Sequence, residues 1–490
     1  MAKLKILMAA SEVGPFARTG GLGDVLGALP KALTALGHEV KVFLPRYGFI
    51  DPSFRLTPLD WNLRVPAGDR SARLTVEHTR LGRGKVEFFF ICNTALFDRS
   101  EFYIDPGTGQ DYSDNDDRFA FFNRAVLETV KKLDWRPDII HVHDWQAGLI
   151  PAYLKTIYAT DLFFSGTRTV LTIHNLGYQG VFAGERFGRL GLPEELFYAM
   201  TGAFEFFGKV NFLKGAISSA DKITTVSKQY AVEIQSSEEF GCGLEGVLRE
   251  RARDLSGIVN GVDYTVWSPT RDKKIQYKYT LANLSGKKKD KVELLGKAGL
   301  PVRERAPLIG MITRLTDQKG LDLIELAAER LFAKNIQMIV LGTGEEKYQL
   351  LLKELEARYP DKLKAYLAFD DGLAHRIEAA SDCFLMPSRW EPCGLNQLYS
   401  LRYGTVPIVR GVGGLTDTVI DYNPETSLGT GFVFQDYTPE AMLEAVERAV
   451  ELFAHKRAWV KIMKSGMQQD FSWEQSAREY ALLFERLAIR

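Results

Sequence analysis

The chain repeats one pattern, in which a short run of apolar residues ends in glycine or polar residues and a segment with helical spacing follows. Short apolar runs with polar ends are typical of strands buried in a parallel sheet, and helices cover both faces of such a sheet. The alternation therefore predicts an α/β fold made of strand–helix–strand units. We expect strands at residues 4–9, 40–44, 86–91, 139–142, 170–173 and 222–226, and at 308–312, 338–341, 365–368, 383–386 and 406–409.

The two sets of expected strands indicate two domains. A chain of 490 residues is too long for one ordinary core. We predict two Rossmann-like domains facing across a cleft, with boundaries at residues 1–258 and 259–467, and a final segment, 468–490, that returns to the first domain as a helix. A lysine-rich run at residues 285–291 lies between the two strand sets, and we interpret it as a solvated helix start rather than a phosphate-binding patch.

Composition limits which binding partners and which cellular compartment we expect for this chain. Lys and Arg number 62, as do Asp and Glu, so the formal charge is zero. A neutral chain argues against electrostatic binding to nucleic acid or to an anionic membrane. Four cysteines show neither metal-ligand spacing nor a disulfide framework, which favours a reducing cytoplasm. The N-terminal apolar run meets Glu12 at once, so we interpret it as a first strand rather than a signal peptide.

The most informative stretch is residues 386–397, Met-Pro-Ser-Arg-Trp-Glu-Pro-Cys-Gly-Leu-Asn-Gln. It places Glu391 in a turn between the carboxyl end of a strand and the start of a helix. Ligands of open α/β sheets bind at that edge, and a helix start offers free N–H groups that suit a phosphate. The alternative is a surface glutamate in an ordinary loop.

A glycine-rich turn, Arg-Thr-Gly-Gly-Leu-Gly-Asp at residues 18–24, follows the first strand in the same way. Glycines allow a ligand close to the backbone, and the following helix start can hold a diphosphate. The dinucleotide fingerprint G-x-G-x-x-G fails here by one residue, because Leu26 stands where the third glycine belongs. This failure weakens the hypothesis of a dehydrogenase, and a simple tight turn is the remaining alternative.

Polar side chains also close two later strands of the first half. His141, His143, Asp144 and Trp145 follow one strand, and His174 follows the next. The histidines raise the hypothesis of a zinc site, but no further ligand at a typical spacing accompanies them. We therefore expect no metal. Asp144 and His174 are expected to bind a polyhydroxyl ligand, whereas His141 is compatible with a hydrogen-bonded core residue.

The second half carries cations in a comparable loop. Arg314 and Lys319 follow the strand at residues 308–312. Two preorganised cations suit a diphosphate leaving group, although loop charges are often only solvated. Gly342 lies in a further turn where a ligand can approach the backbone closely. Phe369 follows an expected strand, where its ring could either stack on a nucleobase or pack in the core.

Taken together these motifs resemble the bacterial glycogen synthase and plant starch synthase family, glycosyltransferase family five. The resemblance runs nearly end to end. The markers are residues 18–24, 98–119, 141–145, 174–180, 314–320 and 387–394, in this order and at matching distances.

The resemblance implies the GT-B fold, with an acceptor-binding first domain and a nucleotide-sugar-binding second domain. It also implies transfer of glucose, with retention, from ADP-glucose to the 4-hydroxyl at the non-reducing end of an α-1,4-glucan. No cofactor or metal is implied, and neither nucleic acid nor membrane is a partner. ADP-glucose and the glucan are the substrates, and the residues alone leave UDP-glucose open as donor.

The resemblance carries roles to individual residues of the second domain. Arg314 and Lys319 would neutralise the leaving diphosphate, and amides at Gly394 and Leu395 would hold its oxygens. Glu391 would contact sugar hydroxyls and support the oxocarbenium-like transition state. The motifs add three donor contacts, namely Gly342, Phe369 beside the adenine, and Cys393.

In the first domain His174 would bind the glucosyl 6-hydroxyl, and Asp144 and Glu12 would line the acceptor side. Amides at Gly20 and Gly21 would hold phosphate oxygens. The motifs add four further contacts to substrate, namely Arg18, Asp24, Trp145 and Asn260, the last at the donor sugar.

The sequence departs from the pattern of its relatives at two positions. The family usually begins its first glycine motif with lysine, but this chain has Arg18, which presents a fork of donors rather than a point charge. Wider relatives place a second glutamate eight residues after Glu391, whereas Tyr399 stands there, as we expect in this subgroup.

The residues also fit the chemistry independently of the resemblance. No carboxylate pair at the spacing of a glycosidase stands out, whereas cations and glycine turns do. A displacement in which the leaving phosphate helps to deprotonate the acceptor needs mainly positioning and electrostatic stabilisation. The competing hypothesis is a non-catalytic two-lobed protein that binds nucleotide sugar or glucan.

Overall fold

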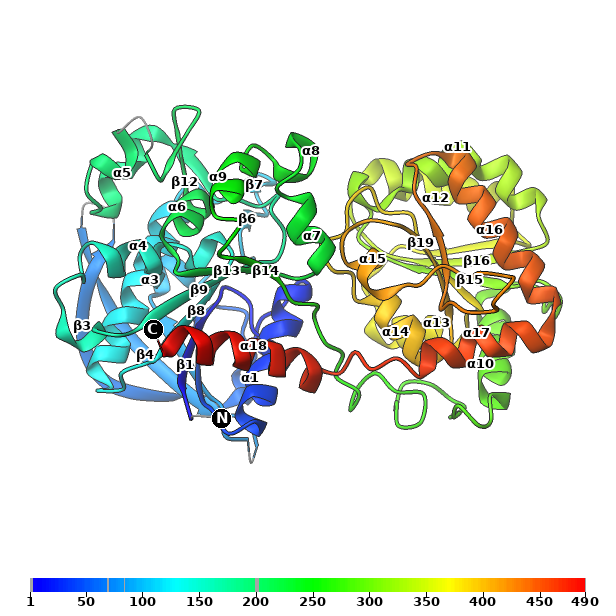
Figure 1. Cartoon of the computed structure of the whole chain (residues 1–490), viewed down its shortest axis with the longest axis horizontal. Helices are drawn as coiled ribbons and strands as arrows, with labels where there is room; N and C mark the ends of the chain where they lie inside the picture. The colour runs from blue at the N-terminus through cyan, green and yellow to red at the C-terminus, as the bar shows by residue number, and fades with distance from the viewer. Residues whose placement is uncertain (1–2, 68–69, 83, 199–201, 490) are drawn as a thin grey trace. The chain divides into compact units, whose positions relative to one another are not determined.

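The computed structural model describes residues 3–67, 70–82, 84–198 and 202–489 and divides the chain into two compact units (Figure 1). Unit 1 comprises Met1–Val226, Ala231–Gly261 and Trp473–Arg490. Unit 2 comprises Ser227–Tyr230 and Val262–Ser472. Each unit has a sheet of mainly or wholly parallel strands with helices around it, which is the α/β architecture expected from the sequence.

Unit 1 is built on a nine-stranded sheet with the order β14-β13-β9-β8-β1-β2-β5-β4-β3. Its strands are β1 (Lys5–Ala9), β2 (Glu39–Pro45), β3 (Thr57–Ala67), β4 (Arg70–Arg80), β5 (Glu87–Cys92), β8 (Ile139–His143), β9 (Arg168–Ile173), β13 (Lys222–Thr225) and β14 (Leu255–Gly257). Strand β1 pairs in parallel with β2 on one side and with β8 on the other. The strand order therefore reverses between β1 and β8, and a crevice opens at such a switch point.

Short ribbons and helices complete this part of the chain. The ribbons are β6 (Ile104–Asp105) with β7 (Gln110–Asp111), and β10 (Val181–Ala183) with β11 (Glu205–Phe206) and β12 (Lys209–Asn211). The helices up to residue 261 are α1 (Gly21–Ala35), α2 (Thr94–Phe97), α3 (Asn115–Lys132), α4 (Leu149–Lys155), α5 (Glu195–Tyr198), α6 (Phe212–Ser219), α7 (Lys228–Glu233), α8 (Glu238–Gly241) and α9 (Glu245–Glu250).

Unit 2 has a six-stranded parallel sheet with the order β17-β16-β15-β18-β19-β20. Its strands are β15 (Leu308–Ile312), β16 (Gln337–Leu341), β17 (Leu363–Tyr366), β18 (Cys383–Met386), β19 (Val406–Arg410) and β20 (Phe432–Phe434). Its helices are α10 (Ser285–Ala298), α11 (Leu321–Ala333), α12 (Glu346–Arg358), α13 (Asp371–Ala380), α14 (Asn396–Tyr403), α15 (Gly413–Thr418), α16 (Pro439–Ala454) and α17 (Lys456–Met467). Here the strand order reverses between β15 and β18.

Most expected strands are confirmed, two of them, β15 and β18, to the residue. The strand expected at residues 365–368 lies two residues earlier, because β17 spans Leu363–Tyr366. The pattern missed the antiparallel strands β3 and β4, which carry many polar residues because they lie at the edge of the sheet.

The lysine-rich run begins helix α10, as expected. The expectation that its side chains are solvated is wrong for Lys287 and Lys291. Lys287 is 4% exposed and donates to Thr405 Oγ1 at 2.6 Å and to the Ala379 carbonyl at 3.0 Å. Lys291 pairs with Asp382 at 2.6 Å. These lysines anchor α10 to the end of α13 and to the residues just before β18 and β19.

The C-terminal helix α18 (Trp473–Ala488) belongs to unit 1, where it packs against α1 (Figure 1). Its Tyr480 and Phe484 rings each lie 5.4 Å from the ring of His141 in β8. Helix α18 thus covers β8, a strand more than 300 residues earlier in the sequence, and it completes the core of unit 1.

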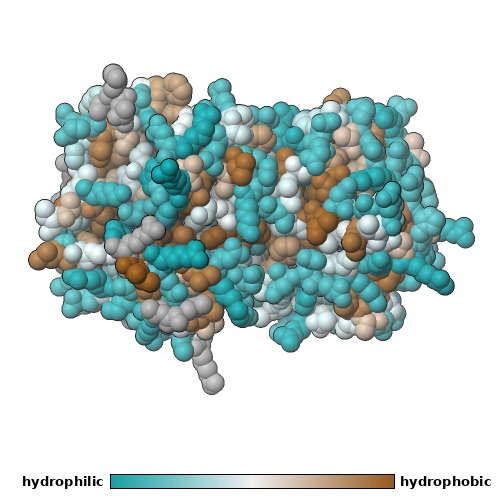
Figure 2. All heavy atoms as spheres, viewed as in Figure 1, coloured by the Kyte–Doolittle hydropathy of each residue, from teal (hydrophilic) through white to brown (hydrophobic). Residues whose placement is uncertain are grey.

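The face of the protein seen in Figure 2 is mainly polar. Figure 2 shows apolar residues on one face as small patches among hydrophilic side chains. Scattered apolar residues are normal on a protein surface. Within the described ranges, no helix combines the length and the apolar character needed to cross a bilayer.

The packing of α18 predicts a large cost for truncating Phe484, which is fully buried. We expect Phe484→Ala to lower the free energy of unfolding by about 3–5 kcal/mol, since the substitution leaves a cavity in the core. Leu482→Ala on the same helix, at a side chain 45% exposed, is the control and should cost less than about 1 kcal/mol. Denaturant unfolding curves measure both, and equal costs would contradict the described packing.

Candidate functional site

In unit 2 the Glu391 carboxylate lies in the turn between β18 and α14, beside the switch point of the sheet. The residue is 6% exposed, and its Oε2 accepts hydrogen bonds from Lys319 Nζ at 2.6 Å and from Ser388 Oγ at 3.0 Å. Lys319 comes from the loop after β15, the strand next to β18. The reversal of strand order therefore brings a cation and a carboxylate together from loops 72 residues apart.

Two glycines allow the loops around this pair to touch. Gly320, at φ 71°, approaches the carbonyl of Pro387 so closely that a Cβ atom would lie 2.0 Å from its oxygen. Gly413, at φ 44°, approaches the Glu391 carbonyl with the same 2.0 Å clearance. A side chain at either position would force the loops apart. The glycines thus hold the Lys319–Glu391 pair in place.

The start of α14 supplies hydrogen-bond donors next to Glu391. Gly394 has a φ of 69°, and Leu395 is the N-cap residue, so the helix begins at Asn396. Leu395 forms no side-chain cap hydrogen bond to the first turn. The N-terminal amides and the positive end of the helix dipole suit a phosphate oxygen.

In unit 1 Asp144 and His174 lie at the carboxyl ends of β8 and β9. The Asp144 carboxylate accepts a hydrogen bond from the backbone N–H of His174 at 2.7 Å. Burial raises the pKa of Asp144 to about 7, although hydrogen bonds from the backbone oppose this shift. Asp144 itself has a φ of 55°, a conformation that is uncommon for a residue with a side chain.

Two buried histidines, His141 and His143, and the half-buried His174 are neutral next to Asp144. His143 Nδ1 lies 3.0 Å from His174 Nε2, and His141 Nε2 lies 2.6 Å from Thr172 Oγ1. Burial lowers the pKa of His141 and of His174 to about 3. His141 is a core residue under α18, whereas neutral His174 can hydrogen-bond an uncharged hydroxyl. Among the described residues, no three His, Cys, Asp or Glu side chains are grouped to hold a metal ion.

The Glu12 carboxylate, just after β1, holds the first glycine turn. It accepts hydrogen bonds from the Thr19 N–H at 2.7 Å, from Thr19 Oγ1 at 3.1 Å and from the Tyr103 hydroxyl at 3.0 Å. Helix α1 begins two residues after Thr19 with Gly20 as its N-cap residue, and no side chain caps it. Glu12 therefore fixes the approach to a helix start that suits a diphosphate.

Comparisons with known proteins agree with this division of the chain. Residues 5–250 match the family model described as the starch synthase catalytic domain, and residues 297–465 match the one described as glycosyl transferases group 1. A glycogen synthase of Koribacter versatilis is 48% identical over 99% of this chain and 98% of its own length. A glycogen synthase of Anaeromyxobacter sp. is 48% identical over 99% of this chain and all of its own.

The chain belongs to the glycogen and starch synthase family.

Solved structures give the same result for this glycogen and starch synthase family member. The catalytic domain of starch synthase IV from Arabidopsis thaliana, bound to ADP and acarbose, has a TM-score of 0.91 and 33% identity over the whole of both chains. Sucrose-phosphate synthase from Thermosynechococcus elongatus is 18% identical with a TM-score of 0.62, over 99% of each chain, and shares the fold. The GT-B fold class and the family resemblance inferred from the sequence are confirmed.

The structure separates the predicted site residues of this family member into two sets. The set in unit 1 is Glu12, Arg18, Gly20, Gly21, Asp24, Asp144, Trp145, His174 and Asn260. The set in unit 2 is Arg314, Lys319, Gly342, Phe369, Glu391, Cys393, Gly394 and Leu395. Their contacts with substrate stay predictions.

Several predicted residues have surroundings that the sequence did not show. The Trp145 ring is 7% exposed and packs against Phe119, with ring centroids 5.0 Å apart. Arg314 is exposed, and Phe369 is 79% exposed. Asn260 is buried, at 4% exposure, and its Oδ1 accepts no hydrogen bond among the described residues.

Other predicted residues form contacts within their own turn or with a neighbouring loop. Arg18 pairs with Asp24 at 2.5 Å across the first glycine turn. The backbone carbonyl of Cys393 accepts a hydrogen bond from Gln397 Nε2 at 2.9 Å. Gly342 packs on the carbonyl of Thr313. The first two contacts shape the turns before α1 and α14, and the third joins the loops after β15 and β16.

Sequence reasoning missed Ser388 and Tyr103, which hydrogen-bond the two buried glutamates. Ser388 lies within the stretch at residues 386–397, three residues before Glu391, so its position there was a usable signal. Tyr103 had no comparable local signal, because its partner Glu12 is 91 residues away.

The raised pKa of Asp144 predicts how its replacement changes stability with pH. Between pH 4 and 7 folded Asp144 keeps a proton that the unfolded chain releases, so this residue makes folding less favourable as pH rises. We expect the free-energy gain of Asp144→Asn relative to wild type to rise with pH by up to about 1.4 kcal/mol per pH unit in this window, and to level off above pH 7.

Urea unfolding from pH 5 to 8 measures the difference between Asp144→Asn and wild type. Asp60→Asn, at an exposed carboxylate, is the control and should leave the pH dependence unchanged. A constant difference between Asp144→Asn and wild type across this range would show that Asp144 is ionised throughout.

Proposed function

We propose that this protein elongates an α-1,4-glucan by transferring glucose, with retention, from ADP-glucose to the 4-hydroxyl at the non-reducing end. The observation that carries the proposal is the largely buried Lys319–Glu391 pair, at the switch point of unit 2 and next to the start of α14, which no side chain caps. A nucleotide sugar has both of the groups that such a pair suits, a diphosphate for the cation and sugar hydroxyls for the carboxylate. Family membership supports the same activity.

The cations and amides of unit 2 act on the leaving group. The bond between the anomeric carbon and the diphosphate breaks, and negative charge grows on the phosphate oxygens. Lys319, exposed Arg314 and the amides at the start of α14 stabilise that charge. Glu391 faces the positive charge that develops on the sugar ring. Because Lys319 and Ser388 already hold this carboxylate, little reorganisation is needed when the reaction occurs.

The acceptor attacks from the face that the diphosphate leaves, which retains the anomeric configuration. The new bond joins the acceptor O4 to the anomeric carbon, and the O4 proton passes to a phosphate oxygen of the departing ADP. This route needs no separate protein base. It depends on positioning and on a site that excludes water, which would otherwise hydrolyse the donor.

Unit 1 supplies groups for sugar hydroxyls and phosphate. Neutral His174 suits a hydrogen bond with the glucosyl 6-hydroxyl, and its burial keeps it neutral across the physiological range. Asp144 and Glu12 are proposed for the acceptor side. The amides at Gly20 and Gly21, at the uncapped start of α1, are proposed to bind phosphate oxygens.

We propose ADP-glucose as the donor and a glycogen-type or maltooligosaccharide chain as the acceptor, without a cofactor or metal. The related starch synthase IV structure holds ADP and acarbose, which supports this choice. Exposed Phe369 is available to stack on the nucleobase. The four cysteines, all free thiols, support the cytoplasm as the compartment.

Replacing either member of the buried pair should remove most of the turnover. We expect Lys319→Ala and Glu391→Ala each to lower kcat by about 10²–10³-fold, the usual cost of losing one preorganised charge. Release of ADP in the presence of glycogen measures the rate, and circular dichroism tests folding. Lys347→Ala, at an exposed cation paired with Asp317, is the control. Rates near wild type in both pair variants would refute the site assignment.

The donor is tested by initial rates with ADP-, UDP- and GDP-glucose on one glycogen primer. We expect ADP-glucose to give the highest kcat/KM, and lengthening of the primer to accompany ADP release. A faster reaction with UDP-glucose would correct the donor. Tight nucleotide-sugar binding without turnover would instead support the alternative of a non-catalytic binding protein.

A further inference from the structure

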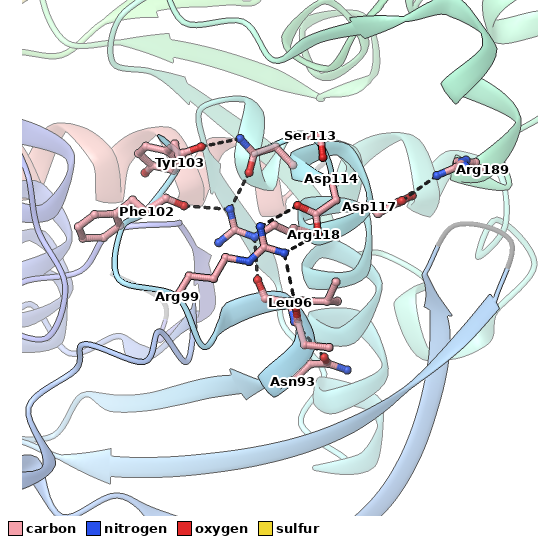
Figure 3. A network of polar contacts seen from close by, with 12 residues as sticks. Asn93, Leu96, Arg99, Phe102, Tyr103, Ser113, Asp114, Asp117, Arg118 and Arg189 are labelled. Atoms are coloured by element: carbon pink, nitrogen blue, oxygen red, sulfur yellow. Dashed lines mark hydrogen bonds and ion pairs between the residues drawn. The ribbon is translucent and has the colours of Figure 1, made fainter. Parts of the chain in front are cut away.

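The segment from Asp98 to Phe119 carries a family marker to which the proposed reaction gives no role. It contains a loop, the ribbon of β6 and β7, and the first turn of α3. A network of polar contacts fills its interior, with the Arg118 and Arg99 side chains at the centre (Figure 3). All the residues of this network belong to unit 1.

Arg118 is a fully buried cation, at 0% exposure. Its Nε donates to the Leu96 carbonyl at 2.8 Å, and its Nη1 donates to the Phe102 carbonyl at 3.0 Å and to Asn115 Oδ1 at 2.6 Å. These acceptors are all uncharged. The guanidinium also lies over the rings of Phe97, Tyr112 and Phe119, 5.0–5.6 Å from their centroids.

A buried cation that donates to neutral oxygens is costly to keep. Removing a charge from water costs several kcal/mol, which hydrogen bonds to carbonyls and cation–π contacts only partly offset. Burial accordingly lowers the pKa of Arg118. An apolar side chain would fill the same space without this cost. The value of the arginine therefore lies in its geometry, because one planar group joins the loop at Leu96 and Phe102 to the start of α3.

A second arginine fixes the outer side of the same segment. Arg99 forms a two-pronged ion pair with Asp114, at 2.8 and 2.5 Å, and lies over the Tyr112 ring at 4.4 Å. The backbone N–H of Tyr112 in turn donates to the Tyr103 carbonyl at 2.9 Å. Both arginines thus act on the backbone at Phe102 and Tyr103.

The contacts continue from this segment to the first glycine turn. Asn115 Nδ2 donates to the Tyr103 carbonyl at 3.0 Å, so Arg118 and Asn115 together set the position of Tyr103. The Tyr103 hydroxyl donates to Glu12 Oε1 at 3.0 Å and contacts Ser11 Oγ at 2.7 Å. Glu12 holds the Thr19 N–H at 2.7 Å, immediately before Gly20 and Gly21.

We propose that Arg118 is a positioning residue, which acts through Asn115, Tyr103 and Glu12 to fix the amides at the start of α1 that bind the donor's phosphate. Its catalytic consequence rests on the proposed function, whereas its effect on the backbone does not. The fully buried guanidinium and the continuous chain of hydrogen bonds to Thr19 are the observations that carry it.

Hydrogen–deuterium exchange tests the proposal without reference to activity. In Arg118→Lys the fork of donors is lost but the charge is kept. We expect amides in the peptide 12–24 to exchange about fivefold faster or more than in wild type, because Glu12 no longer holds the turn firmly. Tyr103→Phe, which removes only the hydroxyl, should show the same local change.

Arg189→Lys is the matched control. Arg189 pairs at 2.9 Å with Asp117, which lies on the same helix as Arg118, and it does not reach Tyr103 (Figure 3). Unchanged exchange at 12–24 in Arg118→Lys and Tyr103→Phe would overturn the proposal. Faster exchange throughout unit 1 would also overturn it, since Arg118 would then only stabilise the fold. If Arg118→Lys does not fold, Asn115→Ala and Tyr103→Phe decide the question by the same measurement.

A double-mutant cycle on ADP-glucose turnover tests the path. We expect Arg118→Lys to lower kcat/KM about tenfold in wild type but less than about twofold in the Tyr103→Phe background, because residues on one path are not additive. Equal losses in the two backgrounds would overturn the proposal. A wild-type protein that transfers no glucose would refute the proposed function instead. Hydrogen–deuterium exchange at residues 12–24 would still test the positioning role of Arg118.

Discussion

The structure depends on the reversal of strand order in each of its two parallel sheets. In unit 1 the chain builds outward from β1 in one direction and then returns to add β8 and the later strands on the other side. Unit 2 repeats this plan around β15 and β18. Adjacent loops at such a point diverge, so polar side chains can line a crevice that helices leave uncovered. Glu12 and Asp144 lie at the first reversal, and Lys319 and Glu391 lie at the second.

Burial gives these side chains their chemical character. His141 in β8 and His174 after β9 are neutral because a charged ring would lose its water, and Asp144 holds its proton more tightly for the same reason. Glu391, by contrast, has Lys319 at 2.6 Å. Uncharged donors and acceptors in unit 1 suit hydroxyl groups, whereas the charged pair in unit 2 suits a sugar diphosphate. The hydroxyl-binding role proposed for His174 and the diphosphate-binding role proposed for Lys319 are each in keeping with the local electrostatics.

The buried polar groups also share a way of joining distant parts of the chain. Arg118 joins a loop to the start of α3, Lys287 joins α10 to the end of α13 and to Thr405 before β19, and Glu12 joins the end of β1 to the first glycine turn. A buried donor or acceptor left without a partner costs about 1–3 kcal/mol. Each such group therefore favours one arrangement of its neighbours. This specificity is what a site that relies on preorganised charges needs.

The sequence by itself determined the parts whose signal is local. Apolar runs marked most strands, because a buried parallel strand needs consecutive apolar residues. The turns that hold Glu391, Lys319 and Gly20 could be placed because glycine, proline and charged residues follow those runs directly. The family motifs, read in order, then indicated the fold and the activity.

Tertiary structure alone decided which of these parts meet. Strand β1 pairs with β8 through Ile6 and Ile139, and Tyr103 reaches Glu12 across 91 residues. Lys287 looks like a solvated lysine in the sequence and is buried. The sequence made His141 compatible with a core residue, but only the fold shows that it lies under α18. Periodicity reports only the neighbours along one helix or strand. The partner of a polar side chain depends instead on strand order and helix packing, which bring together residues that are far apart in the chain.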